Sequence, residues 1–181
     1  SYRKFGKNML IKYLVCSAIF LLFSFLVFRV IVSKDYLKNS KLSPVSYSLE
    51  AIVFAVHANF IYLFIPVKWP ELPALPEDLT LKLIFLAILC LGLVILIIAW
   101  FGLGTKRSFG QDKNKLKTNG IYKYSRNPQL VGYGIILLSF AILFISWYAV
   151  GWFVQYLIIS YLMILSEEEF LNLRYGSDYE N

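Results

Sequence analysis

Hydrophobic and polar positions follow each other along this chain in long blocks rather than in short periods. Strongly apolar blocks with few or no charges are separated by shorter segments that hold most of the charged side chains and prolines. Blocks of this kind suit helices that cross the hydrocarbon core of a bilayer, which takes about 20 residues. The pattern predicts an all-α polytopic membrane protein with about five transmembrane helices, at about Met9–Val32, Val45–Ile65, Leu83–Leu103, Pro128–Tyr148 and Trp152–Ser166.

The last apolar block is too long for a single span. It runs from Asn127 to Ser166, 40 residues without a charge, and as one straight helix it would be roughly 60 Å long, about twice the hydrocarbon core. Interfacial aromatics belong at a membrane surface, so a tight hairpin is predicted where they gather, around Trp147, Tyr148, Gly151 and Trp152. The second arm is expected to continue into a short cytoplasmic C-terminal helix from Glu167 to about Tyr175.

The connecting segments set the expected topology. Residues 34–43 are predicted to be a polar loop, and four prolines at positions 66, 70, 73 and 76 exclude a regular helix between the second and third spans. Seven of the 18 Lys and Arg residues lie between Lys106 and Arg126. The positive-inside rule therefore predicts that the loop of residues 104–127 and the C-terminus are cytoplasmic, with the N-terminus outside.

Composition supports a single integral-membrane domain over residues 1–181. The chain is 59% hydrophobic with a mean hydropathy of +0.64, which is too apolar for an ordinary soluble domain. The net charge of +7 arises beside predicted spans, which favours contact with anionic membrane lipids over nucleic acid. Cys16 and Cys90 lie in apolar stretches, and a single histidine excludes a multi-histidine metal site. No obligate protein partner is indicated.

Two polar motifs bracket the last apolar block, and together they carry a family resemblance. They read Gly120-x-Tyr122, Arg126-Asn127-Pro128-x-x-x-Gly132 and Glu167-Glu168-x-x-Leu171-x-x-x-Tyr175-Gly176-x-x-Tyr179. This pattern resembles the C-terminal signature of the isoprenylcysteine carboxyl methyltransferase and phospholipid N-methyltransferase superfamily. Asn127, Leu130 and Tyr175 stand where many members carry His, Tyr and Phe. The resemblance implies S-adenosylmethionine as cofactor, bound by the part of the chain from about 102 to 181.

The residue types of the two motifs suit the groups of that cofactor. Arg126 and the N–H groups that open the fourth span suit its carboxylate, since Asn127 can cap and Pro128 can begin a helix there. Glu167 or Glu168, rather than Glu169, suits its ammonium. Tyrosines suit the adenine and the sulfonium, and Gly132 would let the cofactor approach the helix backbone. The expected cofactor-binding residues are Gly120, Tyr122, Tyr124, Arg126, Asn127, Pro128, Leu130, Gly132, Glu167, Glu168 and Tyr175.

Glu50 and His57 are ionisable residues inside the second predicted span. They are seven residues apart, so they share one helix face, and such groups in a span are by default functional. The alternative is structural hydrogen bonding within a cluster that includes Asn59. Glu50 is expected near the cytoplasmic end, where it could take a proton from an amine acceptor. The candidate catalytic residues are therefore Arg126, Glu167 and Glu50.

The predicted function is S-adenosylmethionine-dependent methyl transfer to a lipid-like or small hydrophobic acceptor at the cytoplasmic membrane face. Isoprenylated cysteine, an ethanolamine phospholipid, a small thiol and a quinone-like lipid all remain open as acceptors. Two alternatives belong to other classes. One is an NADPH-dependent membrane reductase, because the sterol-reductase group resembles these methyltransferases in its C-terminal half. The other is a non-catalytic subunit that binds anionic lipid through the Lys106–Arg126 loop.

Overall fold

The computed structural model describes residues 2–39, 41–103 and 125–175, and all of its regular elements within those ranges are helices. This confirms the all-α prediction. A π-helical segment, η1, interrupts the first helix, and one 3₁₀ turn, η2, follows the third. The elements are α1 (Tyr2–Phe25), η1 (Leu26–Val32), α2 (Ser33–Asn39), α3 (Pro44–Phe60), η2 (Ile61–Leu63), α4 (Leu79–Leu103), α6 (Pro128–Phe144) and α7 (Trp147–Tyr175).

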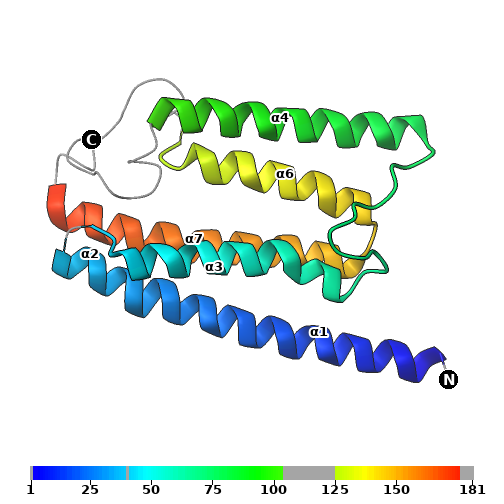
Figure 1. Ribbon diagram of the computed structural model, residues 1–181, viewed down its shortest axis with the longest axis horizontal. Coiled ribbons are helices and arrows are strands. Elements are labelled where there is room, and N and C mark those ends of the chain that lie inside the picture. Colours follow the sequence, from blue (N-terminus) through cyan, green and yellow to red (C-terminus); the bar gives the residue numbers. More distant parts are fainter. Residues whose placement is uncertain (1, 40, 104–124, 176–181) are drawn as a thin grey trace.

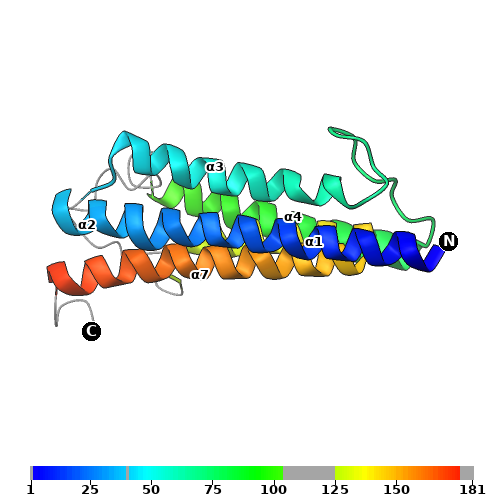
Figure 2. The same ribbon diagram turned by 90° about the horizontal axis from the view of Figure 1, so that it is seen from below.

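The helices run side by side along one axis, with successive passes in alternating directions (Figure 1). α1, η1 and α2 follow one another without a break and form the first pass. The other passes within the described ranges are α3, α4, α6 and α7, so that α1 begins and α7 ends at opposite ends of the bundle. Seen from below, α1 lies between α3 and α7, with α4 behind them (Figure 2). This is the five-helix arrangement that the hydropathy pattern predicts.

Length and apolar composition suit most of these passes to a bilayer. Among the described residues, four helical segments are long and apolar enough to cross a membrane: Asn8–Asn39, Pro44–Leu63, Leu79–Phe101 and Trp147–Leu173. The helix Pro128–Phe144 is also apolar but shorter. In α4 only 17% of the most apolar stretch is buried within the chain. Its outward leucine, isoleucine and valine side chains form a surface that lipid covers better than water does.

Aromatic side chains fill the contact between α1, α3 and α7. The ring of Tyr13 meets Phe64 edge-on, with centroids 4.9 Å apart, and its hydroxyl donates to the Tyr148 carbonyl at 3.0 Å. Farther along the bundle, Phe54 and Tyr133 both pack against the buried ring of Tyr156. Such edge-to-face contacts add to the burial of the rings themselves. They hold α7 in the middle of the bundle.

Facing glycines bring α4 and α6 into close contact. A Cβ atom on Gly132 would lie 2.7 Å from the Leu96 backbone nitrogen and 3.0 Å from the Gly92 oxygen. A Cβ on Gly92 would lie 2.8 Å from the Ile136 nitrogen. The backbones of the two helices can approach this closely only because neither residue has a side chain, as is common where membrane helices pack.

The turn between the last two helices lies earlier than predicted. It is made by Ile145, which ends α6 in the left-handed conformation (φ 45°, ψ 52°), and by Ser146. The Ser146 hydroxyl accepts from the Tyr148 backbone N–H at 3.2 Å, so a serine cap starts α7 here. The predicted turn around Trp147–Trp152 is wrong because Trp152 is a core residue, 3% exposed, and not an interfacial one. The predicted continuation of the last span past Glu167 is confirmed, since α7 runs unbroken to Tyr175.

The predicted polar loop at residues 34–43 is also mostly helix, because α2 extends to Asn39. The Asp35 carboxylate closes the short connection to α3. It accepts from the Ser43 backbone N–H at 3.0 Å and forms a short hydrogen bond with the Ser46 hydroxyl. Ser43 caps α3 in turn, accepting from the Ser46 N–H at 3.2 Å. This network leaves only a tight turn between two helices. The proline-rich connector, in contrast, contains no regular helix from Ile65 to Glu77, as predicted.

Candidate active site

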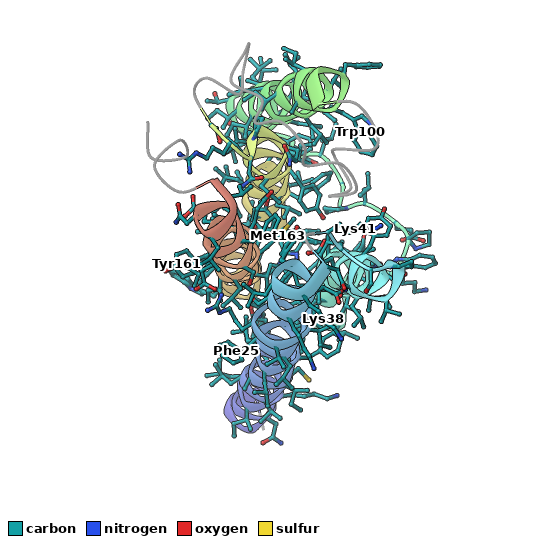
Figure 3. All side chains as sticks on the ribbon, turned by 90° about the vertical axis from the view of Figure 1, so that its left-hand side faces the viewer. Phe25, Lys38, Lys41, Trp100, Tyr161 and Met163 are labelled. Carbon is teal, nitrogen blue, oxygen red and sulfur yellow. The ribbon has the colours of Figure 1, made fainter. Side chains whose placement is uncertain are left out.

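One end of the bundle gathers the polar ends of several helices. There α2 ends, α3 and α6 begin and α7 ends. Figure 3 looks onto this end: Lys38 and Lys41 mark the α2–α3 turn, Met163 of α7 lies toward the centre, and Tyr161 points outward. The two sequence motifs, which begin α6 and close α7, therefore return to the same end. We call this the motif end.

The two motifs meet through an ion pair. The Arg126 guanidinium, just before α6, lies 3.9 Å from the Glu168 carboxylate on α7. Both side chains are about half exposed, at 53% and 44%, and the distance is at the long limit for a salt bridge. Exposed pairs of this kind contribute little to stability. The pair thus places a cation beside an anion at a distance longer than that of a close salt bridge.

Glu169 has a different partner from Glu168. Its carboxylate receives two hydrogen bonds of 2.9 Å from the Arg29 guanidinium, one to each oxygen. Arg29 also lies 3.4 Å from the Ser166 hydroxyl. Ser166 in turn donates to the Phe28 carbonyl at 2.8 Å. Glu169 therefore fastens α7 to the first pass of the bundle.

Glu167 lies within electrostatic range of α2. Tyr36 of α2 interacts electrostatically with both Glu167 and Glu50. Tyr36 is 3% exposed and Glu50 is 7% exposed, so both the phenol and the carboxylate are buried. The Tyr36 ring also stacks on Phe170 of α7, with centroids 5.0 Å apart and planes 14° apart. The predicted role of Glu50 at the site stays a prediction.

An open pocket lies beside this cluster, at the α2–α3 turn. Its volume is ≈ 680 Å³. Tyr47 is on its wall and is one helical turn before Glu50, on the same face of α3. The lining residues are Asn39, Lys41, Leu42, Ser43, Pro44, Tyr47 and Ser48. The pocket therefore lies on the α3 side of the motif end.

The start of α6 is built as the sequence predicts, except for the cap itself. Pro128 is the first residue of the helix and is fully buried. The Asn127 carbonyl accepts from the Leu130 and Val131 N–H groups, but its side chain makes no capping hydrogen bond. The predicted side-chain cap is therefore wrong. The Leu130 carbonyl accepts from the Tyr156 hydroxyl at 2.6 Å, which ties the start of α6 to the core of α7.

Gly132 has a neighbour that the sequence does not reveal. The side on which a side chain would lie is filled by the α4 backbone, at Leu96. The requirement for glycine at this position is thus explained by helix packing. Contact between Gly132 and a cofactor stays a prediction.

Several predicted site residues lie outside the described residues. Gly120, Tyr122 and Tyr124, with the basic loop, belong to the segment 104–124. Tyr175 is the last residue of α7, and its side chain is not described. The described part of the site therefore consists of the motif end without its basic loop.

His57 belongs to the core rather than to this site. It is completely buried, and its ring stacks on Trp152 with centroids 5.3 Å apart and planes 5° apart. Asn59 does not join Glu50 and His57 in a cluster. It is exposed, donates to the Ala55 carbonyl and accepts from the Trp69 indole. The structural alternative for His57 therefore holds, with Trp152 as partner in place of Asn59.

Sequence reasoning missed Arg29 and Tyr36. Each lies in the first pass of the bundle (α1, η1 and α2), which we call the N-terminal rod, more than 100 residues before its contact on α7. Their only sequence signal is type and place: an arginine inside an apolar block, and a tyrosine just beyond its end. Neither feature allows the contact with α7 to be predicted from the sequence.

The fold and this charged end define an all-α membrane protein with a polar site at one end of its helices. Residues 79–178 match the phospholipid methyltransferase family, which is more than half of the 181 residues. The chain belongs to the phospholipid methyltransferase family. Membership implies methyltransferase activity in general and suggests lipid-like substrates. No curated protein and no solved structure matches the chain significantly.

Proposed function

We propose that this protein transfers a methyl group from S-adenosylmethionine to a lipid-like acceptor at the motif end of the bundle. One observation carries the proposal: Arg126 and Glu168, from the two family motifs, lie 3.9 Å apart and half exposed. The reaction class comes from the family, and this pair supplies a place where the cofactor fits.

The fit rests on charge. The amino-acid end of S-adenosylmethionine is a zwitterion, with a carboxylate and an ammonium on the same carbon. A guanidinium can bind a carboxylate through two parallel hydrogen bonds, and a carboxylate can accept from an ammonium. Arg126 and Glu168 thus match the two charges of the ligand, and their own long contact is easily replaced by two shorter ones. Glu167, one residue earlier, offers a second acid.

When bound, S-adenosylmethionine supplies an electrophilic methyl group on a sulfonium, whose sulfur keeps the bonding electron pair as the methyl leaves. The acceptor's lone pair forms the new bond. The residues of this chain mainly align the two reactants and exclude water, which are the main sources of rate for such a displacement. Arg126 and Glu168 orient the amino-acid end of the cofactor.

Glu50 is placed to handle a proton. An amine acceptor must lose a proton in order to attack, whereas a thiolate or carboxylate acceptor need not. Glu50 is 7% exposed and lies one turn from the pocket wall at Tyr47. We assign it the role of general base for an amine acceptor, with Tyr36 as its neighbour. By the positive-inside rule, this end of the bundle faces the cytoplasm.

The proposal is tested by following the methyl group. Purified protein in lipid nanodiscs is incubated with radiolabelled S-adenosylmethionine and a panel of ethanolamine lipids, prenylated cysteine peptides, quinols and small thiols. Label is expected in an organic-soluble product, and Arg126→Ala should strongly reduce it at S-adenosylmethionine concentrations that do not saturate the variant. Label only in water-soluble products would contradict a lipid-like acceptor. No label from any acceptor, together with binding of NADPH, would assign the protein to the membrane reductases instead.

A further inference from the structure

Arg29 joins the N-terminal rod to the acidic motif of α7. It contributes two 2.9 Å hydrogen bonds to Glu169, and its side chain is only 23% exposed. A bidentate arginine–carboxylate pair fixes both distance and orientation. Arg29 lies outside residues 79–178, which match the family. The contact therefore links the unmatched N-terminal part of the chain to the family motif.

A second contact lies on the same face of α7. Ser166, three residues before Glu169, is 1% exposed and donates to the Phe28 carbonyl at 2.8 Å. Phe28 and Arg29 both lie in the π-helical segment Leu26–Val32. The wider turn of a π-helix changes the backbone hydrogen-bond register and is often found at functional sites. Here the Phe28 carbonyl also accepts from Ser33, five residues later.

Two anchors on one face fix the rotation of α7 about its own axis. Successive residues of an α-helix point about 100° apart. With Glu169 held against Arg29, Glu168 points toward Arg126, as their contact shows, and Glu167 lies within electrostatic range of Tyr36. A small rotation of α7 would move both carboxylates away from these partners. The three consecutive acids are thus divided into one anchor and two site residues.

We propose that Arg29 is a positioning residue for the methyl-transfer site, acting through Glu169 to set the direction of Glu167 and Glu168. The proposal rests on the function proposed above. It gives the N-terminal rod a specific role in the site. A merely structural Arg29 would change stability but leave cofactor affinity and the α6–α7 geometry as they are.

The experiment measures affinity and geometry in the same set of variants. S-adenosylhomocysteine binding is measured by calorimetry in nanodiscs. The distance distribution between nitroxide labels at Val131 on α6 and Leu173 on α7, both exposed, is measured by pulsed electron resonance, with Cys16 and Cys90 replaced. Arg29→Gln and Glu169→Gln break the pair from either side, so one variant suffices if the other does not fold. Lys34→Gln removes a positive charge from an exposed position nearby and is the control.

We expect Arg29→Gln and Glu169→Gln each to weaken binding about tenfold, as for a charge-assisted hydrogen bond that is held less well. Both should shift or broaden the label distances, and Lys34→Gln should do neither. The exchanged pair Arg29→Glu with Glu169→Arg should recover most of the affinity. Arg29→Lys, which cannot bind both oxygens in the same way, should recover only part.

The outcomes separate the two proposals. Unchanged affinity and unchanged distances in both Gln variants would overturn the positioning role while leaving the methyl transfer intact. If the parent protein binds no S-adenosylhomocysteine, the proposed function fails and the distances alone decide. Distances that change with Arg29→Gln then still support positioning, and unchanged distances overturn it.

Discussion

Trp152 and His57 are joined by two hydrogen bonds, each from one side chain to the other residue's backbone carbonyl. The Trp152 indole N–H donates to the His57 carbonyl at 2.7 Å. The His57 Nε2 atom lies 2.8 Å from the Trp152 carbonyl. Because a carbonyl only accepts, Nε2 must carry a hydrogen atom. Nδ1 is buried and has no hydrogen-bond partner in the part of the chain that the structure describes.

This pair should stabilise the contact between α3 and α7. Trp152→Phe keeps an aromatic ring but removes the indole N–H that donates to the His57 carbonyl, and we expect a loss of about 1 to 3 kcal/mol, the usual cost of removing one partner of a buried hydrogen bond. His57→Phe should cost a similar amount. Because the two residues contact each other, the double variant should cost less than the sum. Unfolding in detergent measures all three.

Trp147→Phe is the matched control, since Trp147 is on the same helix and is 86% exposed. It should leave stability unchanged. Additive effects of Trp152→Phe and His57→Phe, or no effect of either, would contradict the pairing. Nitrogen-15 spectra of labelled His57 should show the hydrogen on Nε2, and a hydrogen on Nδ1 alone would contradict the assignment.

Gly132→Ala should destabilise the contact between α4 and α6. The added Cβ would lie 2.7 Å from the Leu96 backbone nitrogen, and a backbone atom cannot move aside as a flexible side chain can. We expect a loss of about 1 to 3 kcal/mol, typical of overpacking. Thermal unfolding in detergent measures it. Val94→Ile adds a carbon at an exposed position of α4 and should be neutral, whereas equal effects of the two changes would contradict the close packing.

Glu50→Gln separates proton transfer from cofactor binding. If Glu50 is the base for an amine acceptor, this change should lower kcat about 10²- to 10⁴-fold, the usual contribution of a general base. The affinity for S-adenosylhomocysteine should stay within about twofold, since Glu50 contacts the acceptor side. Turnover and calorimetry on the same preparation measure both effects.

Glu71→Gln is the control for the loss of one negative charge, because Glu71 is exposed and lies in the proline-rich connector. It should change neither kcat nor the affinity for S-adenosylhomocysteine. A thiol acceptor should be methylated by Glu50→Gln at nearly the parent rate, because it needs no base. Loss of cofactor affinity in Glu50→Gln would instead place Glu50 on the cofactor.

Hydropathy predicted the number of passes because each apolar block has to lie in lipid. It placed the last turn too late, since the aromatic residues near position 150 suit a membrane surface and a helix core equally well. Trp152 is in the core because His57 offers it a carbonyl, and His57 is 95 residues away. The sequence feature that marks the true turn is Ser146, because serine is a favoured residue at the start of a helix.

In the candidate site, too, the local motifs could be predicted from the sequence, whereas contacts with residues far along the chain could not. Motif spacing predicted that Arg126 and the acids of α7 share one end, and the Arg126–Glu168 pair confirms the meeting. It could not assign the three consecutive acids to partners, because helix rotation depends on Arg29, a residue 140 positions before Glu169. The sequence predicts a contact between Gly132 and the cofactor, because no motif in α4 indicates that its backbone packs against Gly132.

Titration with S-adenosylhomocysteine tests the central claim most directly. The protein in nanodiscs should bind it saturably in calorimetry. Arg126→Ala and Glu168→Gln should each weaken binding roughly tenfold to a hundredfold, since each removes a charged hydrogen-bond partner of the ligand. Lys68→Ala and Glu71→Gln, the same charge changes in the connector at the other end of the bundle, should leave binding unchanged. Binding of NADPH but not of S-adenosylhomocysteine by well-folded protein would contradict the account.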